Sequence, residues 1–166
     1  MPIIIPTLII SFLLDGMISN LITLDTNYFN PLFSLAALII IYPYFNKNNN
    51  HYLLIASVYG LIYDMVYTDT FALNLAIFLL LAVITKYMNS VLNINIINTL
   101  INLLVLIVLY RSLTYFILIL GGYLEFDIMA LFKSIYSSLI INFVYCLIGY
   151  YFLDYLSYRF RIKKWD

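Results

Sequence analysis

Side chains that commonly perform chemistry are scarce in this chain of 166 residues, which contains one cysteine, one histidine and one tryptophan. Cys146 has no second cysteine to pair with, so neither an internal disulfide nor a thiolate metal site is available. The single histidine, His51, stands in an Asn-rich stretch, where it cannot activate a helix-borne serine in the manner of an intramembrane protease. No glycine-rich phosphate-binding motif occurs. We therefore expect a protein that is not an enzyme and that has no catalytic, metal-binding or cofactor-binding residues.

Charged residues are also few, at 10% of the chain, whereas hydrophobic residues make up 65% and the mean hydropathy is +1.02. Soluble domains are roughly half apolar, and one of this size could not bury so large an excess. At about 25 to 28 residues for each membrane span with its connection, the length accommodates about six helices. The sequence thus predicts an all-α membrane protein, a single polytopic bundle over residues 1–166 whose surroundings are lipid and which has no nucleic-acid partner.

Hydropathy predicts where the six spans lie. The N-terminal stretch lacks the basic region and the small-residue cleavage site of a signal peptide, so we expect it to remain as the first helix. The second and third spans are short, which tilt, local bilayer thinning or tyrosines at the helix ends can accommodate. The predicted spans cover residues 3–24, 31–45, 52–67, 71–88, 96–120 and 130–153, and a basic tail follows at 154–166.

The connections between these spans alternate in charge. One set, together with the tail, carries six basic and two acidic residues, a net charge of +4, while the other set carries four acidic residues only. Because basic segments stay in the cytoplasm, this pattern predicts that both termini are cytoplasmic, in a bacterial inner membrane. The basic residues can also meet acidic lipid head groups or a cytoplasmic partner, although setting the topology explains them equally well. The basic set is Lys47, Lys86, Arg159, Arg161, Lys163 and Lys164 with Asp154 and Asp166, and the acidic set is Asp25, Asp69, Glu125 and Asp127.

Three ionisable residues fall inside predicted spans, where a buried charge is costly and needs a partner or a function. Asp15 precedes the end of the first span by nine residues, and Arg111 precedes the end of the fifth span by nine as well. At 1.5 Å per residue both lie about 13 Å from the outer helix ends, so an ion pair between them is geometrically possible. Two alternatives stay open: Arg111 can extend to the outer interface, or it can meet Asp64, the third of these residues.

Asp64 lies about one turn before the end of the third span, and Gly60 lies one turn earlier on the same helix face. A glycine there lets another backbone come close to the helix. We expect Gly60 and Asp64 to be the main functional feature of the chain, in partner binding or packing. The alternative is a structural role in which Asp64 caps the next helix around residues 68–70, since Ser, Thr and Asp are the usual cap residues.

The stretch GLIYDMVYTDTFALNLAIFL at residues 60–79 resembles the signature region of the MreD family of rod shape-determining membrane proteins. In that family a helix ends in Gly-Leu-x-x-Asp, a short polar turn follows, and the next helix opens on a Gly-Leu-Asn-like sequence. Thr68 and Ala72 stand where glycine is more usual, although Ala72 keeps the small size that close helix contact needs. The matching residues are Gly60, Leu61, Asp64, Leu73 and Asn74.

The resemblance implies a non-enzymatic scaffold of the bacterial cell-elongation machinery. Such a protein binds MreC and helps to couple cytoplasmic MreB filaments to peptidoglycan synthesis by an elongation-specific transpeptidase and glycosyltransferase. The rival interpretation is the substrate-binding membrane subunit of an energy-coupling-factor vitamin transporter, which also has six helices. A subunit of that kind should have an outer-facing pocket with convergent polar groups, for which Asp15, Asp64 and Arg111 are candidates. It should also have a small-xxx-small docking face, for which the sequence offers only Ala72 and Ala76.

Overall fold

The computed structural model describes residues 3–21, 31–46, 50–68 and 72–164. All regular elements within these ranges are helices, which confirms the all-α prediction. Their order along the chain is α1 (Ile4–Leu21), α2 (Phe33–Ile41), the short 3-10 helix η1 (Tyr42–Tyr44), α3 (His51–Tyr67), α4 (Leu73–Val91), α5 (Ile96–Leu120) and α6 (Ile128–Arg159).

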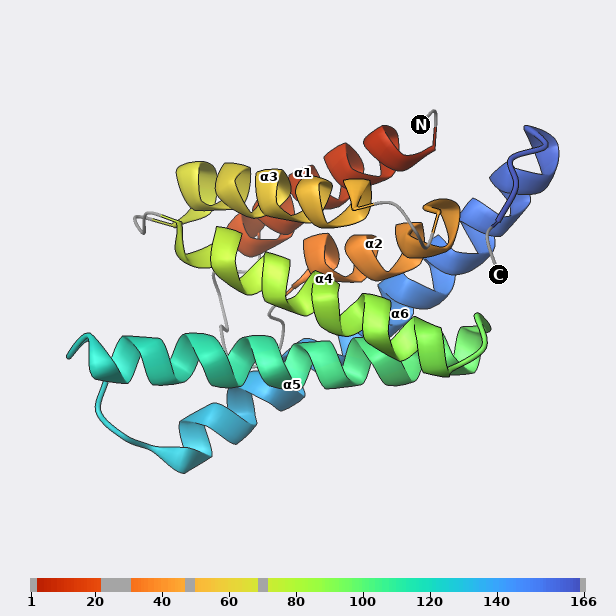
Figure 1. Ribbon diagram of the computed structural model, residues 1–166. Helices are drawn as coiled ribbons and strands as arrows, with labels where there is room; N and C mark the ends of the chain where they lie inside the picture. The colour runs from red at the N-terminus through yellow and green to blue at the C-terminus, as the bar shows by residue number, and fades with distance from the viewer. Residues whose placement is uncertain (1–2, 22–30, 47–49, 69–71, 165–166) are drawn as a thin grey trace.

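The short helix α2 lies in the middle of the bundle, and the longer helices surround it (Figure 1). All nine residues of α2 are buried, and Ala36 and Ala37 have no exposed surface. α2 packs against α1, α4, α5 and α6, while α3 is held chiefly by α4. The sequence of α2, FSLAALIII, is apolar on nearly every side, and a helix of that composition is stable when protein or lipid encloses it completely. The core of the molecule is therefore built around α2.

Local sequence explains where the helices begin and end. Pro43, in η1, has no backbone N–H to continue a helix, and α2 stops just before it. Asn95 caps α5, because its side-chain oxygen accepts the backbone N–H of Asn98 at 2.8 Å. After the last turn of α5, Gly122 has a φ of 74°, a left-handed conformation that glycine adopts without steric cost. The chain can therefore reverse direction between α5 and α6.

Each helix overlaps one of the six predicted spans, with two differences in length. α2 is shorter than its span because Pro43 ends it. α6 runs on to Arg159, so the first residues of the predicted tail are helical. In the part of the chain that the structure describes, three helices are long and apolar enough to cross a membrane, namely α4, α5 and α6. That all six segments cross the bilayer stays a prediction.

The start of α1 and the end of α6 lie at one end of the bundle, and the α5–α6 turn lies at the other (Figure 1). We call the first the basic end, since it holds Lys86 on α4 and the basic residues that follow position 158. Glu125 and Asp127 lie at the opposite end. Lys47, Asp25, Asp69 and Asp166 belong to the predicted charge pattern but lie outside the described residues. Which end faces the cytoplasm therefore stays a prediction.

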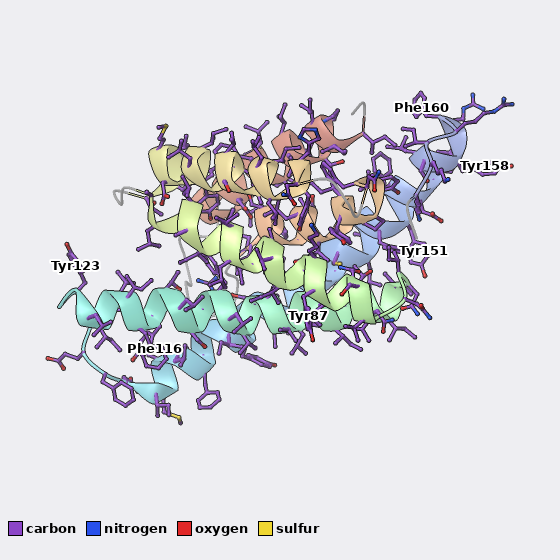
Figure 2. All side chains as sticks on the ribbon, in the orientation of Figure 1. Tyr87, Phe116, Tyr123, Tyr151, Tyr158 and Phe160 are labelled. Carbon is purple, nitrogen blue, oxygen red and sulfur yellow. The ribbon has the colours of Figure 1, made fainter. Side chains whose placement is uncertain are left out.

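Exposed aromatic side chains mark both ends of the molecule. Tyr151, Tyr158 and Phe160 point outward from the last turns of α6, and Phe116 and Tyr123 do so near the far end of α5 (Figure 2). Tyrosine and tryptophan collect at membrane–water interfaces because their rings are apolar and their polar groups reach water. The distribution of aromatic residues is thus typical of a helix bundle whose long axis crosses a bilayer.

Candidate functional site

Asp64 is buried near the end of α3, and its carboxylate points at the first turn of α4. Oδ1 accepts three hydrogen bonds: from the backbone N–H of Asn74 at 3.0 Å, from the side-chain amide of Asn74 at 2.9 Å, and from the Thr68 hydroxyl at 3.0 Å. Oδ2 accepts the backbone N–H of Leu75 at 3.0 Å. The first N–H groups of a helix have no partner within the helix and carry partial positive charge. Asp64 satisfies two of them and so joins the end of α3 to the start of α4.

Gly60 lies one turn before Asp64 and faces the same part of α4. A Cβ atom at this position would come within 2.5 Å of the Asn74 carbonyl oxygen and 2.8 Å of the Leu75 Cα. Both are backbone atoms, so no side-chain rotation would relieve the contact. The missing side chain therefore lets α3 and α4 approach closely enough for Asp64 to reach the N–H groups of α4.

The two positions where the family more usually has glycine differ from each other in this chain. Ala72, directly before α4, has a φ of 61°, in the left-handed region that favours glycine. Thr68 has extended backbone with a φ of −133°, which any residue adopts, and its hydroxyl contributes the bond to Asp64. The other two motif residues, Leu61 and Leu73, are half-buried, and Leu73 packs against the core.

The same arrangement occurs a second time, between α1 and α2. Asp15 is buried, its Oδ1 accepts the backbone N–H of Phe33 at 2.7 Å, and its Oδ2 accepts that of Ser34 at 2.8 Å. A small residue stands four positions before each aspartate, Ser11 in the first copy and Gly60 in the second. The pairs α1–α2 and α3–α4 are thus built alike, each with an aspartate that satisfies the start of the following helix.

Tyrosine and asparagine side chains connect these two pairs to each other and to the remaining helices. The Tyr59 hydroxyl of α3 is within hydrogen-bonding distance, 2.9 Å, of both a backbone carbonyl of α1 and the Ser34 hydroxyl of α2. Tyr110 of α5 donates to Oδ1 of Asn74 at 3.0 Å. Asn142 of α6 accepts the backbone N–H that precedes α2 at 2.9 Å. The polar groups inside the bundle therefore form links between helices, where lipid could not satisfy them.

Arg111 is half-buried on α5, and its Nε donates to the Ser138 hydroxyl of α6 at 2.9 Å. Asp15 directs both carboxylate oxygens at backbone N–H groups, as described above. An Asp15–Arg111 ion pair therefore stays a prediction. Every oxygen of the two buried carboxylates accepts a backbone N–H of the following helix, so both carboxylates hold helices together. The capping role considered for Asp64 matches these contacts, in which the capped backbone N–H groups are those of Asn74 and Leu75. Of the residues 68–70 considered for this role, 69 and 70 lie outside the described residues.

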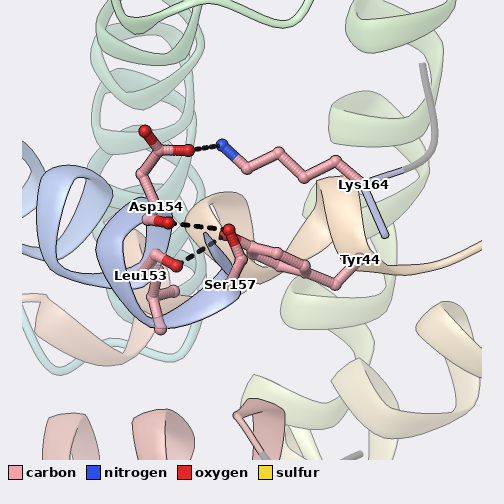
Figure 3. Close-up of polar contacts among 5 residues, drawn as sticks. All are labelled: Tyr44, Leu153, Asp154, Ser157 and Lys164. Carbon is pink, nitrogen blue, oxygen red and sulfur yellow. Dashed lines mark hydrogen bonds and ion pairs between the residues drawn. The ribbon is translucent and has the colours of Figure 1, made fainter. Parts of the chain in front are cut away.

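A second polar cluster lies at the basic end, between η1 and α6 (Figure 3). Lys164 turns back from the tail to form an ion pair with Asp154, and its ammonium lies 5.2 Å from the ring centre of Tyr150 and 5.9 Å from that of Tyr44. Tyr44 in turn donates to the Leu153 carbonyl at 3.1 Å. Partial burial lowers the pKa of Lys164, but the Asp154 carboxylate and the two phenol groups outweigh it and raise this pKa overall. These contacts hold the residues that follow α6, up to Lys164, against the bundle.

Sequence reasoning missed the links made by Tyr59, Tyr110 and Asn142, and it missed that Asp15 caps α2. A signal for Asp15 was present: a small residue followed four positions later by aspartate occurs twice, each time on a helix that precedes another. The intervals between the aspartate and its first backbone donor differ, at 18 residues for Asp15 and 10 for Asp64, which hides the repeat. No local pattern distinguishes the tyrosines and Asn142 from their neighbours.

Comparison with protein families matches residues 1–159 to the family described as rod shape-determining protein MreD. The matched region contains all six helices and ends at the last residue of α6. No curated protein and no solved structure matches the chain.

Proposed function

The chain belongs to the MreD family of rod shape-determining membrane proteins, and from that premise we propose that it is a non-enzymatic scaffold of the cell-elongation machinery. In this proposal it lies in the bacterial inner membrane with both termini in the cytoplasm. It binds MreC and helps to couple MreB filaments to peptidoglycan synthesis by the elongation-specific transpeptidase and glycosyltransferase. The observation that carries the proposal is the family match over residues 1–159 of the 166.

The geometry supports a protein that acts by presenting fixed surfaces. Both buried aspartates are occupied by backbone N–H groups, and α2 is enclosed on all sides, so the bundle has little freedom to change shape. The α5–α6 hairpin, by contrast, projects beyond the other helices at the end opposite the basic end (Figure 1). It exposes large apolar side chains at Leu120, Phe126, Met129 and Phe132. We propose this hairpin as a surface for a membrane segment of the partner, since it projects beyond the other helices and the side chains that it exposes are apolar.

Gly60 and Asp64 face the inside of the α3–α4 pair, so in this proposal they affect the partner through the position of that pair rather than by contact. We expect Asp64→Ala and Gly60→Leu to lower MreC binding more than they lower protein abundance. The measurement is the amount of MreC recovered per amount of folded protein, determined by size-exclusion chromatography of a fluorescent fusion. Equal losses of binding and abundance would reduce the motif to a folding role.

The experiment that tests the function is a pull-down of the tagged, detergent-solubilised protein from its native membrane, followed by mass spectrometry. Recovery of MreC with elongation enzymes supports the scaffold. Recovery of paired ATPases with a coupling membrane protein would instead identify a vitamin-transporter subunit and overturn the proposal. Cross-linking from an introduced cysteine at Met129 locates the contact, and the same change at Val83, exposed on α4, is the control.

A further inference from the structure

A narrow groove of about 180 Å³ lies between α1 and α6 on the surface of the bundle. Its walls are almost entirely apolar, with Thr7 and Ile10 on α1 and Ile148 and Phe152 on α6. Gly149 lies in the same groove, where its missing side chain leaves α6 close to α2. Tyr145 of α6 also lines the groove, and a hydrogen bond of 2.6 Å between its hydroxyl and that of Ser11 on α1 ties the two helices together. The apolar walls suit a part of a hydrocarbon chain.

A stripe of exposed side chains leads from this groove to the basic end. Ile148, Phe152, Tyr155 and Arg159 are spaced by four, three and four residues, which places them on one face of α6. All four are exposed. The stripe spans eleven residues, about 16 Å along the helix axis at 1.5 Å per residue. That is about half of the ~30 Å hydrocarbon thickness of a bilayer, so the stripe has the length of one leaflet.

The basic end of the stripe holds two arginines in a hollow. Arg159 and Arg161 line a polar depression together with Tyr155 and Tyr158. Arg161 has a φ of 52°, a left-handed conformation that costs a non-glycine residue about 1 kcal/mol or more. The backbone N–H of Ile162 closes this turn on the Ser157 carbonyl at 2.9 Å, and the Lys164–Asp154 pair holds the following residues. Local contacts thus fix the end of the helix in a conformation that favours glycine at position 161. The residue at that position is nevertheless an arginine.

From these observations we propose that the groove and the two arginines form a binding site for one anionic glycerophospholipid of the leaflet that faces the basic end. An acyl chain lies in the α1–α6 groove, and the ring of Tyr155 lies at the level where the chain meets the glycerol. Arg159 and Arg161 bind the phosphate, whose oxygens match the geometry of guanidinium donors. The site is complementary to this class of lipid, because it has apolar walls in the groove and two positive charges about one leaflet length away. A zwitterionic lipid would bind the arginines less strongly.

The test is native mass spectrometry of the full-length protein in detergent, titrated with phosphatidylglycerol and with phosphatidylcholine of identical acyl chains. We expect tighter binding of phosphatidylglycerol. Each Arg→Gln change should weaken it about fivefold, the equivalent of about 1 kcal/mol per basic residue near an anionic surface. The double variant Arg159→Gln, Arg161→Gln should therefore lose about 25-fold. Lys133→Gln, an exposed basic residue near the opposite end of α6, is the matched control and should stay within about twofold.

Three further measurements separate the site from a general attraction between opposite charges. Arg161→Gly should raise the melting temperature, because it relieves the left-handed arginine, and yet weaken phosphatidylglycerol binding. Ile148→Trp, which fills the groove from its exposed edge, should weaken binding with both arginines present, and glycerol phosphate without acyl chains should bind far more weakly than the lipid. Equal binding of the two lipids, an equal loss in Lys133→Gln, or unchanged binding in Ile148→Trp would each overturn the proposal.

Discussion

Removing the Asp64 carboxylate should destabilise the fold far more than removing an aspartate that caps a helix at the surface. Asp64→Ala loses four hydrogen bonds and removes the acceptor of the buried N–H of Asn74 and of the partly buried N–H of Leu75. A hydrogen bond to a charged group contributes about 1.5–3 kcal/mol, and an unsatisfied buried donor costs about 1–3 kcal/mol. Because these terms overlap and the side chains of Thr68 and Asn74 can find other acceptors, we expect a net loss of about 4 kcal/mol.

The assay is thermal unfolding in detergent, followed by fluorescent size-exclusion chromatography. A protein of this size loses about 2–4 °C of melting temperature per kcal/mol, so Asp64→Ala should melt about 8–16 °C lower than the wild type. Asp64→Asn keeps one acceptor oxygen and turns an amide donor toward the second N–H group. We therefore expect about half of that effect.

Asp127→Ala is the matched control, because Asp127 also caps a helix. It accepts the backbone N–H of Met129 at 2.9 Å, but it is exposed, so water can replace it. The expected loss is about 1 kcal/mol, or about 2–4 °C. If Asp64→Ala and Asp127→Ala melted at similar temperatures, the assignment of Asp64 as the link between α3 and α4 would be wrong.

Four further changes test other features of the fold. Gly60→Ala should cost about 1–3 kcal/mol in unfolding free energy, because its Cβ would meet the α4 backbone, while Gly149→Ala should cost less, since its Cβ meets only the flexible end of Ile40. Both are read from melting temperatures, and equal costs would contradict the close approach at Gly60. Ala72→Gly should raise the melting temperature by about 1–3 °C, because glycine adopts a φ of 61° freely; a fall would show that the turn is not strained. Lys164→Gln should lower stability by less than about 1 kcal/mol, since the ion pair is partly exposed. A raised pKa means that this contribution is complete below the ordinary value of 10.5 and is lost only above it, so the difference from wild type should stay constant between about pH 6 and 9.

The helices could be located from the sequence because each is a long apolar run ended by a recognisable residue, such as Pro43 after α2. The family motif also indicated Gly60 and Asp64. Glycine is favoured at position 72 because the backbone there is left-handed, and the sequence alone does not reveal that conformation. The partner of Asp15 could not be predicted, because depth along a helix gives the level of a side chain but not its direction. Depth made Arg111 a candidate, whereas the donors to Asp15 are backbone N–H groups of α2, for which the spacing of Ser11 and Asp15 was the available signal.

The enclosure of α2 also bears on how the chain is made. A nine-residue helix is about 14 Å long, less than half of the ~30 Å hydrocarbon thickness, so lipid alone gives it no stable place. One of the helices that covers it is α6, which the ribosome completes more than a hundred residues later. Until then the first half of the protein holds an unfinished core, and a chain interrupted before α6 should be a ready substrate for membrane proteases. We therefore expect insertion into the bilayer and completion of the core around α2 to be separate events, and the arrival of α6 to decide the second.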